Sequence, residues 1–182
     1  KRGPLGGTFV NSLTLEDIAQ NVTSAATLLV TIGGLKMAEI AEARIEMEGL
    51  CCDLAVKHAT EETIDLLAEV LQEQKSVSLT DEEFCASDVR FHRLIVEATG
   101  NTMLRFVMYA LIEALVPVTN MVIVYVRDRS SIIAHHNDML LALERRDAAA
   151  MRKHLRSLVD YLLASYSQAK KERKRRTSGR TS

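Results

Sequence analysis

Tryptophan is absent from this chain of 182 residues, aromatic residues make up only 4% of it, and proline occurs only at positions 4 and 117. No run of alternating β-branched residues is present that would predict strands. Residues that favour helices are plentiful instead, chiefly Ala, Leu, Glu, Arg and Met. Because 47% of the residues are hydrophobic, the chain can bury one sizeable core. We therefore expect one main domain built of helices.

Cysteine is scarce as well. The chain has three cysteines, Cys51, Cys52 and Cys85, of which two are adjacent and none are spaced as C-x-x-C. An odd number in this arrangement does not form a disulfide framework, and free thiols are typical of a reducing cytoplasm. Nothing in the chain resembles a signal peptide. We expect a cytoplasmic protein without disulfides.

Only one long apolar stretch is present, from Phe106 to Val126, and Glu113 is its only charged residue. A membrane-spanning helix needs about 20 apolar residues, so the stretch is nearly long enough. However, Glu113, Pro117 and Asn120 interrupt it. This pattern favours a pair of buried helices, and we expect no membrane partner.

Familiar catalytic motifs are missing too. The chain has no nucleophile elbow, no P-loop, no G-x-G-x-x-G and no H-E-x-x-H. His92 is followed by Arg93 and Leu94, so no general base stands where a zinc protease would have one. The sequence predicts that the chain is not an enzyme.

Charge is unevenly spread along the chain. Residues 170–180 contain seven basic residues and one acidic residue, Glu172, so this segment carries +6 while the whole chain carries −1. The remainder is therefore acidic, at −7, which argues against nucleic-acid binding over the whole surface. We expect residues 169–182 to be a solvated, flexible tail, with non-specific phosphate binding as the alternative.

Helical periodicity divides most of the chain into consecutive segments. The helices that we expect cover residues 13–31, 37–57, 60–74, 81–99, 102–115 and 128–146, with the apolar run continuing over 118–127. A final helix, capped by Asp147, carries inward-facing residues as far as Leu162. No internal repeat is visible. The prediction is all-α, an antiparallel helical bundle of about seven or eight helices.

Residues suited to helix ends stand at the predicted boundaries. Thr80 to Glu83 match a capping box, and Thr60 and Asp147 can cap the helices that follow them. Gly100 should end one helix and Pro117 should break another. On helix 37–57, the core candidates are Ile40, Ala41, Ile45, Leu50 and Leu54.

Asp88 and His92 are four residues apart on a helical stripe that also carries Phe84, Phe91 and Ile95. This spacing places both side chains on one face. Burying a carboxylate and an imidazole without partners is costly, so we expect either mutual hydrogen bonds or a shared metal ion.

Two further histidines, His136 and His154, lie on apolar stripes of two later helices. One carboxylate and three neutral imidazoles form a reasonable site for a divalent transition metal such as zinc, nickel, copper or iron. The alternative for each histidine alone is an ordinary core or surface residue.

Arg44 and Glu48 are one turn apart on the helix expected over 37–57. We expect them to form an ordinary ion pair, unless a pocket faces them.

Five motifs follow one another along the second half of the chain: Asp88-x-x-Phe91-His92, Glu97-Ala98-x-Gly100-Asn101, His136 before Ala142-Leu143, Asp147, and Met151-Arg152-x-His154-Leu155. In combination they resemble the C-terminal effector-binding domain (FCD domain) of FadR-type transcriptional regulators in the GntR family. Glu42-Ala43-Arg44 and the residues from Glu48 to Ala55 resemble the first long helix of that domain. The residues from Lys1 to Val10 look like the wing of a winged-helix DNA-binding domain.

The resemblance implies a dimeric ligand-sensing bundle that holds a divalent metal through Asp88, His92, His136 and His154. Zinc and nickel are the leading candidates for this metal. The metal would help to bind a small carboxylate effector, and Arg44 stands where the family often has a pocket arginine. Effector binding would change the affinity for DNA by moving the two DNA-binding domains.

The chain departs from the family pattern in two ways. The main body of the winged helix is absent, so Lys1 and Arg2 are at most the remnant of a DNA-contacting wing. In addition, the spacing from Asp147 to His154 is one helical turn shorter than usual in the family, which would shift His154 by about 6 Å along the helix axis. His154 is therefore the ligand that this spacing puts in question.

We divide the chain accordingly into a wing remnant (1–10), a linker with a first helix (11–35), the effector-binding and dimerisation domain (36–168) and the basic tail (169–182). Two other functions stay open on the residues alone. One is a helical metalloenzyme, for which Glu48 is the only nearby acid or base. The other is a metal-free helical interaction module whose histidines are merely buried.

Overall fold

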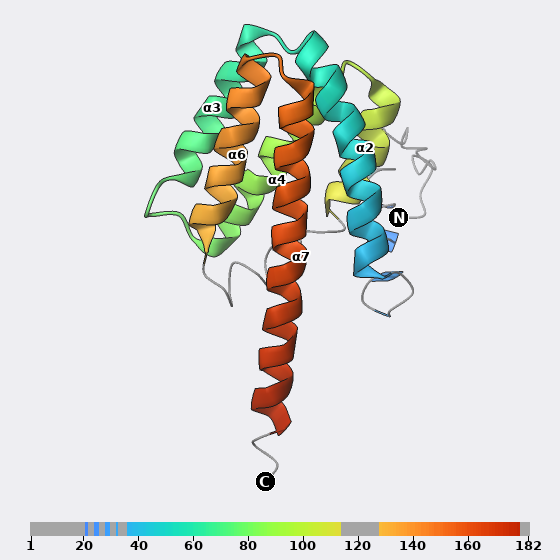
Figure 1. The fold of residues 1–182 in the computed structure, drawn as a ribbon, viewed down its shortest axis with the longest axis vertical. Helices are drawn as coiled ribbons and strands as arrows, with labels where there is room; N and C mark the ends of the chain where they lie inside the picture. Colours follow the sequence, from blue (N-terminus) through green and yellow to red (C-terminus); the bar gives the residue numbers. More distant parts are fainter. Residues whose placement is uncertain are drawn as a thin grey trace, which may run out of the picture.

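A computed structural model describes residues 36–113 and 128–178, with a few single positions between 21 and 32. Within these ranges every regular element is a helix (Figure 1), which confirms the all-α prediction. The helices are α2 (Met37–His58), α3 (Glu61–Gln74), α4 (Asp81–Glu97), a helical segment over 102–113, α6 (Arg129–Glu144) and α7 (Ala148–Ser178). Lys1, Arg2, the wing remnant and Pro117 lie outside the described residues.

The predicted caps begin the helices that position the core. The Thr60 hydroxyl accepts from the Thr63 amide at 3.2 Å, and the Asp147 carboxylate accepts from the Ala150 amide at 2.9 Å. Thr80 and Glu83 form the reciprocal capping box at the start of α4. Each cap satisfies backbone donors that would otherwise lack a partner in the first helical turn.

Gly100 turns the chain after α4. Its φ of +67° lies in the left-handed region, which glycine adopts without the steric cost of a Cβ. The side chain of Asn101 then accepts from the amides of Met103 and Leu104, at 3.0 and 3.1 Å, and so starts the next helix. The predicted stop and restart are both confirmed.

Helix α7 lies against both α2 and α6, while α3 packs on α4 and α6 and α4 also contacts α2 (Figure 1). The main core therefore draws residues from α2, α3, α4, α6 and α7. Its members include Ala41, Ile45, Cys52, Leu67, Leu71, Phe91, Ile95, Met139, Leu143, Met151 and Leu155. This arrangement brings the polar residues on the buried faces of α2, α4 and α6 into the same interior.

The prediction for the core face of α2 was wrong at Leu50, which is 45% exposed. Cys51 and Cys52 are fully buried in its place, and all three cysteines are free thiols. Leu50 directly precedes these two cysteines but lies outside the buried face of the helix. The burial of α2 between α4 and α7 decides which residues face inward, and the local sequence does not.

The last helix runs further than expected, because α7 continues to Ser178 and projects beyond the bundle (Figure 1). Most of the segment expected to be a flexible tail is therefore helical. Lys and Arg have good helix propensity, and a helix already formed in the bundle extends at little cost. Among the described helices, none is both long and apolar enough to cross a membrane.

Candidate metal and ligand site

Three of the predicted ligands meet in the interior. Asp88 and His92 lie one turn apart on α4, and His136 comes from α6. One potential ligand atom from each lies within 4.8 Å of the other two, and all three residues are buried. The structure thus brings His136 next to two residues of α4 that precede it by at least 44 positions in the sequence.

The inward-facing atoms of this cluster are poorly satisfied by one another. His136 Nε2 lies 3.3 Å from His92 Nε2 and 3.4 Å from Asp88 Oδ1. Asp88 Oδ1 is buried, and none of the residues that the structure describes forms a hydrogen bond with it. A buried oxygen in this condition costs free energy unless another group binds it.

The outward-facing nitrogens of the two imidazoles are both engaged. His92 Nδ1 contacts Glu48 Oε1 on α2, and His136 Nδ1 lies 2.8 Å from Gln74 Oε1 on α3. Both partners are oxygens that accept, so each Nδ1 donates its proton. In a neutral imidazole the other nitrogen then carries a lone pair. When both rings are neutral, two lone pairs and one carboxylate oxygen point at the same place, which is the donor set that a divalent metal ion binds.

Burial sets the protonation of the cluster. It lowers the pKa of His136 well below 6.5, helped by His92 and Arg44, and so keeps this ring neutral, as a metal ligand must be. Burial also raises the pKa of Asp88 above 3.8, and Glu48 adds to this rise, whereas His92 and Arg44 oppose it. A bound cation would reverse this effect by favouring the charged carboxylate.

Arg44 and Glu48 form a buried ion pair beside the cluster, not a pair on the surface. Arg44 Nε donates to Glu48 Oε2 at 2.7 Å, and both side chains are almost completely buried. Burial raises the pKa of Glu48, but His92 and Arg44 outweigh this and lower it to about 2. Within residues 36–113 and 128–178, no group forms a hydrogen bond with the buried Arg44 Nη2, so one donor of the predicted pocket arginine is available to an anion.

His154, the fourth predicted ligand, lies elsewhere in the structure. Its side chain on α7 is 29% exposed, and its Nδ1 is 3.5 Å from Asp138 Oδ2. Only residues 145–147 connect α6 to α7, and His154 on α7 is not grouped with Asp88, His92 and His136. The neighbouring His135 also lies away from the cluster, 6.2 Å from the ring of Tyr161.

Sequence reasoning missed Gln74, which orients His136. A signal for it was present, because Gln74 follows Leu67 and Leu71 at helical spacing and is buried with them. The histidines were predicted as ligands because they are polar residues on apolar helical stripes. The same criterion applies to Gln74.

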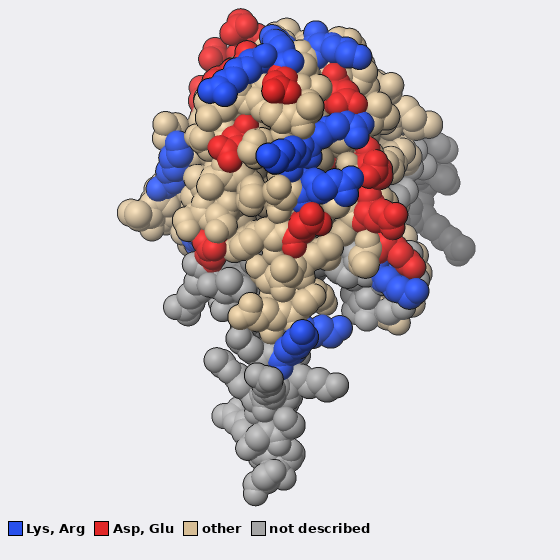
Figure 2. Space-filling view, in the orientation of Figure 1, with Lys and Arg blue, Asp and Glu red and all other residues tan. Residues whose placement is uncertain are grey.

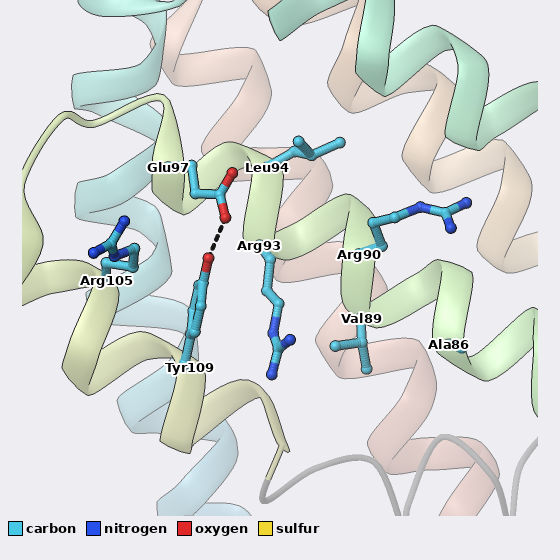
Figure 3. Close-up of a pocket in the computed structure, with 8 residues that line it drawn as sticks. All are labelled: Ala86, Val89, Arg90, Arg93, Leu94, Glu97, Arg105 and Tyr109. Atoms are coloured by element: carbon cyan, nitrogen blue, oxygen red, sulfur yellow. Dashed lines mark hydrogen bonds between the residues drawn. The ribbon is translucent and has the colours of Figure 1, made fainter. Parts of the chain in front are cut away.

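A surface groove of about 510 Å³ lies on the other side of α4, between α4 and segment 102–113 (Figure 3). Its charged residues are largely paired: Arg90 contacts Glu73, Arg93 contacts Glu113 and stacks on Tyr109, and the Tyr109 hydroxyl donates to Glu97. The visible face of the molecule likewise mixes acidic and basic side chains (Figure 2). The buried cluster is therefore the better candidate for a specific site.

The chain is similar to known proteins of one family. The family model of the FCD domain matches residues 39–161. NanR of Escherichia coli, named an HTH-type transcriptional repressor, is 34% identical over 84 residues, which are 46% of this chain and 31% of NanR. The chain thus matches about a third of the length of this relative. That NanR is named a repressor accords with the prediction that this chain is not an enzyme.

Two solved structures share the fold. E. coli McbR/YncC superposes with a TM-score of 0.65 at 18% identity, covering 85% of this chain and 96% of that chain. Streptococcus agalactiae GntR gives a TM-score of 0.59 at 14% identity, covering 92% of this chain and 73% of that chain. The predicted resemblance is confirmed, and the chain belongs to the FCD domain family.

Proposed function

We propose that this chain is the effector-sensing and dimerisation domain of a GntR/FadR-type transcriptional regulator. It binds a divalent transition metal, with zinc and nickel as the leading candidates, together with a small carboxylate effector. The longer protein binds DNA through an N-terminal winged-helix domain, and effector binding changes its affinity for DNA. The relatives named as transcriptional regulators and the buried donor set support this proposal.

The observation that carries the metal site is the orientation of both histidines. Each Nδ1 is engaged by a neighbouring oxygen, so Nε2 of His92 and Nε2 of His136 face each other at 3.3 Å beside the unsatisfied Asp88 Oδ1. A cation between these atoms would be bound by both nitrogens and by the carboxylate oxygen at once. The residues therefore fit a metal with three protein ligands and open positions for other ligands.

A metal bound there would act as a Lewis acid that holds one end of a carboxylate. Arg44 would bind the anion through Nη2, a donor that has no partner among the described residues. Because all of these groups are buried, the charge-assisted hydrogen bond is stronger than it would be in water. Together, Arg44 and the metal select small anions over neutral compounds.

The metalloenzyme alternative needs a free general acid or base beside the metal. Glu48, the only candidate named from the sequence, has one oxygen on Arg44 and the other on His92. It is thus already committed as a structural acceptor. The metal-free interaction module leaves Asp88 Oδ1 and Arg44 Nη2 unexplained.

Metal content tests the site directly. The chain is purified without a metal-affinity column, with and without zinc or nickel supplementation, and analysed by elemental analysis. We expect about one equivalent in the wild type and loss of metal in His136→Ala. His135→Ala removes the adjacent histidine outside the cluster and should keep the metal, and His154→Ala asks whether the fourth predicted ligand contributes. No metal in the supplemented wild type would restore the metal-free module as the leading function.

The regulatory role is tested on the longer protein that includes the DNA-binding domain. Small carboxylates that bind the metal-loaded chain are identified by thermal shift, and their effect on DNA affinity is then measured. We expect at least one of them to change the DNA affinity. If every carboxylate that binds leaves the DNA affinity unchanged, the regulatory proposal is wrong.

A further inference from the structure

A single buried carboxylate, Glu48, connects the two halves of the proposed site. Its Oε2 accepts from Arg44 Nε at 2.7 Å, and its Oε1 contacts His92 Nδ1. None of the three side chains is exposed by more than 2%. No water is needed to satisfy either oxygen, so the position of Glu48 depends on these two partners.

On the histidine side, Glu48 determines where His92 carries its proton. An acceptor-only carboxylate at Nδ1 requires a proton on that nitrogen. Nε2, which faces Asp88 and His136, is then the nitrogen available to a metal. If this acceptor were lost, the proton could move to Nε2 and block the ligand atom.

On the arginine side, Glu48 determines which edge of the guanidinium is free. The bond to Nε holds Arg44 along α2, at the i,i+4 spacing of the pair. Nη2 is left buried, without a partner in the part of the chain that the structure describes. The same contact therefore orients Arg44 and leaves one of its donors unused for an anion.

Gln74 provides an internal comparison. It accepts from His136 Nδ1 at 2.8 Å, as Glu48 does from His92, but it is neutral and orients one side chain of the site only. Glu48 alone among the described groups contacts both a candidate metal ligand and the candidate anion-binding arginine.

We propose that Glu48 is a positioning residue that couples metal binding at His92 to anion binding at Arg44. This inference rests on the proposed function, whose metal and carboxylate it links. A change in how His92 is held is transmitted through one rigid carboxylate to Arg44, without movement of the backbone. The protein would thus sense the anion fully only when the metal site is formed.

Two variants test the coupling. Removing Glu48 alone would leave Arg44 as an unpaired buried cation, so the double variant Arg44→Met/Glu48→Met removes both charges and keeps the volume. Arg44→Met is the matched control that retains Glu48. Glu48→Gln offers one acceptor oxygen where the carboxylate has two, so it can serve Arg44 or His92 but not both.

The first readout is the protonation of His92 Nδ1 in the metal-free chain, measured by nitrogen-15 NMR. We expect a proton on Nδ1 in the wild type and in Arg44→Met, and its loss in the double variant. Zn²⁺ affinity, measured by competition with a chromophoric chelator, should be about 10- to 100-fold weaker in the double variant than in Arg44→Met. A residue that only filled space would change neither measurement.

The second readout uses acetate as the anion probe on chain loaded with Co²⁺, followed by the visible absorption of the metal. Glu48→Gln should lose either the Nδ1 proton of His92 or the response to acetate, while the wild type keeps both. The coupling is overturned if the double variant matches Arg44→Met, or if Glu48→Gln keeps both properties. Failure of the wild type to bind metal would refute the proposed function, whereas the NMR measurement on metal-free chain would still decide whether Glu48 sets the proton of His92.

Discussion

His136 and His92 face each other in the core, but different acceptors hold them. His136 is paired with the neutral Gln74, and His92 with the carboxylate of Glu48. The protonation of each ring therefore depends on residues from other helices. The protonation of His136 should affect the stability of the metal-free chain, which can be measured.

The stability of the metal-free chain should fall as the pH drops below about 6.5. Burial first, and then His92 and Arg44, lower the pKa of His136 well below 6.5 in the folded state. In the unfolded chain this histidine binds a proton near pH 6.5, so the unfolded state binds more protons and gains stability in acid. The contribution of His136 is thus present above pH 6.5 and is lost below it.

This prediction is checked by denaturant unfolding between pH 7.5 and pH 5.5, in the presence of a chelator. His136→Gln cannot bind the proton, so its free energy of unfolding should depend less on pH than that of the wild type. Glu48, whose pKa is lowered from 4.5 to about 2, contributes to acid sensitivity only below this range. Equal pH dependence in the two proteins would contradict the prediction.

At the scale of helices, the predicted caps and most predicted boundaries, other than the end of α7, agree with the structure, because they depend on residues within three or four positions of one another. Thr60, Thr80, Gly100 and Asp147 all act as expected. The end of α2 is different, because a residue far away in the sequence completes it. Arg146 donates to the carbonyl oxygens of Val56 and Ala59, at 3.1 and 2.9 Å.

Arg146→Ala should destabilise the chain by about 1–2 kcal/mol, because two charge-assisted hydrogen bonds to the end of α2 are lost. Arg146 also has a positive φ of 56°, which a glycine adopts more readily. Arg146→Gly should therefore be less destabilising than Arg146→Ala, since it loses the same hydrogen bonds but relieves the backbone. Denaturant unfolding measures both changes.

The neighbouring Arg145 serves as the control: it is exposed, as Arg146 is, but only Arg146 donates side-chain hydrogen bonds to α2 among the described contacts of these two residues. Arg145→Ala should alter the free energy of unfolding by no more than about 0.5 kcal/mol. Equal losses in Arg145→Ala and Arg146→Ala would show that the contacts of Arg146 with α2 do not contribute.

At the scale of the whole molecule, a metal that binds only the folded state should stabilise the entire bundle. The cluster joins α4 and α6, and its outer partners come from α2 and α3. At a free Zn²⁺ concentration 100 times the Kd, the gain is about 2.7 kcal/mol. This corresponds to a rise in Tm of roughly 5–10 °C for a chain of this size. Thermal unfolding should show the rise in the wild type and in His135→Ala, and its absence in His136→Ala.

The basic end of α7 should contribute little to the stability of the bundle. The last buried residue described on α7 is Ser165, and Lys170 and Lys171 are exposed. A chain that ends at Ala169 should unfold within about 1 kcal/mol of the full chain, although its net charge changes from −1 to −7. A larger loss, measured by denaturant unfolding, would show that residues 170–182 pack on the bundle.

Much of this protein follows from the sequence alone. Helical composition, apolar periodicity and the caps predict the class of fold and most helix boundaries, because these depend on local interactions. The polar residues on apolar stripes also pointed to Asp88, His92 and His136, which the structure places together. That they bind a metal stays a prediction.

Only the tertiary structure decided which faces of the helices meet, because rotation and register depend on packing between helices and not on any one of them. Packing of α2 against α4 and α7 exposes Leu50 and turns Arg44 and Glu48 inward to His92. The register of α7 leaves His154 beside Asp138, and the end of α3 brings Gln74 to His136. The sequence by itself thus determined the helices and three of the polar residues in the core, whereas the assembly of the helices decided how protons, charges and free donors are arranged around them.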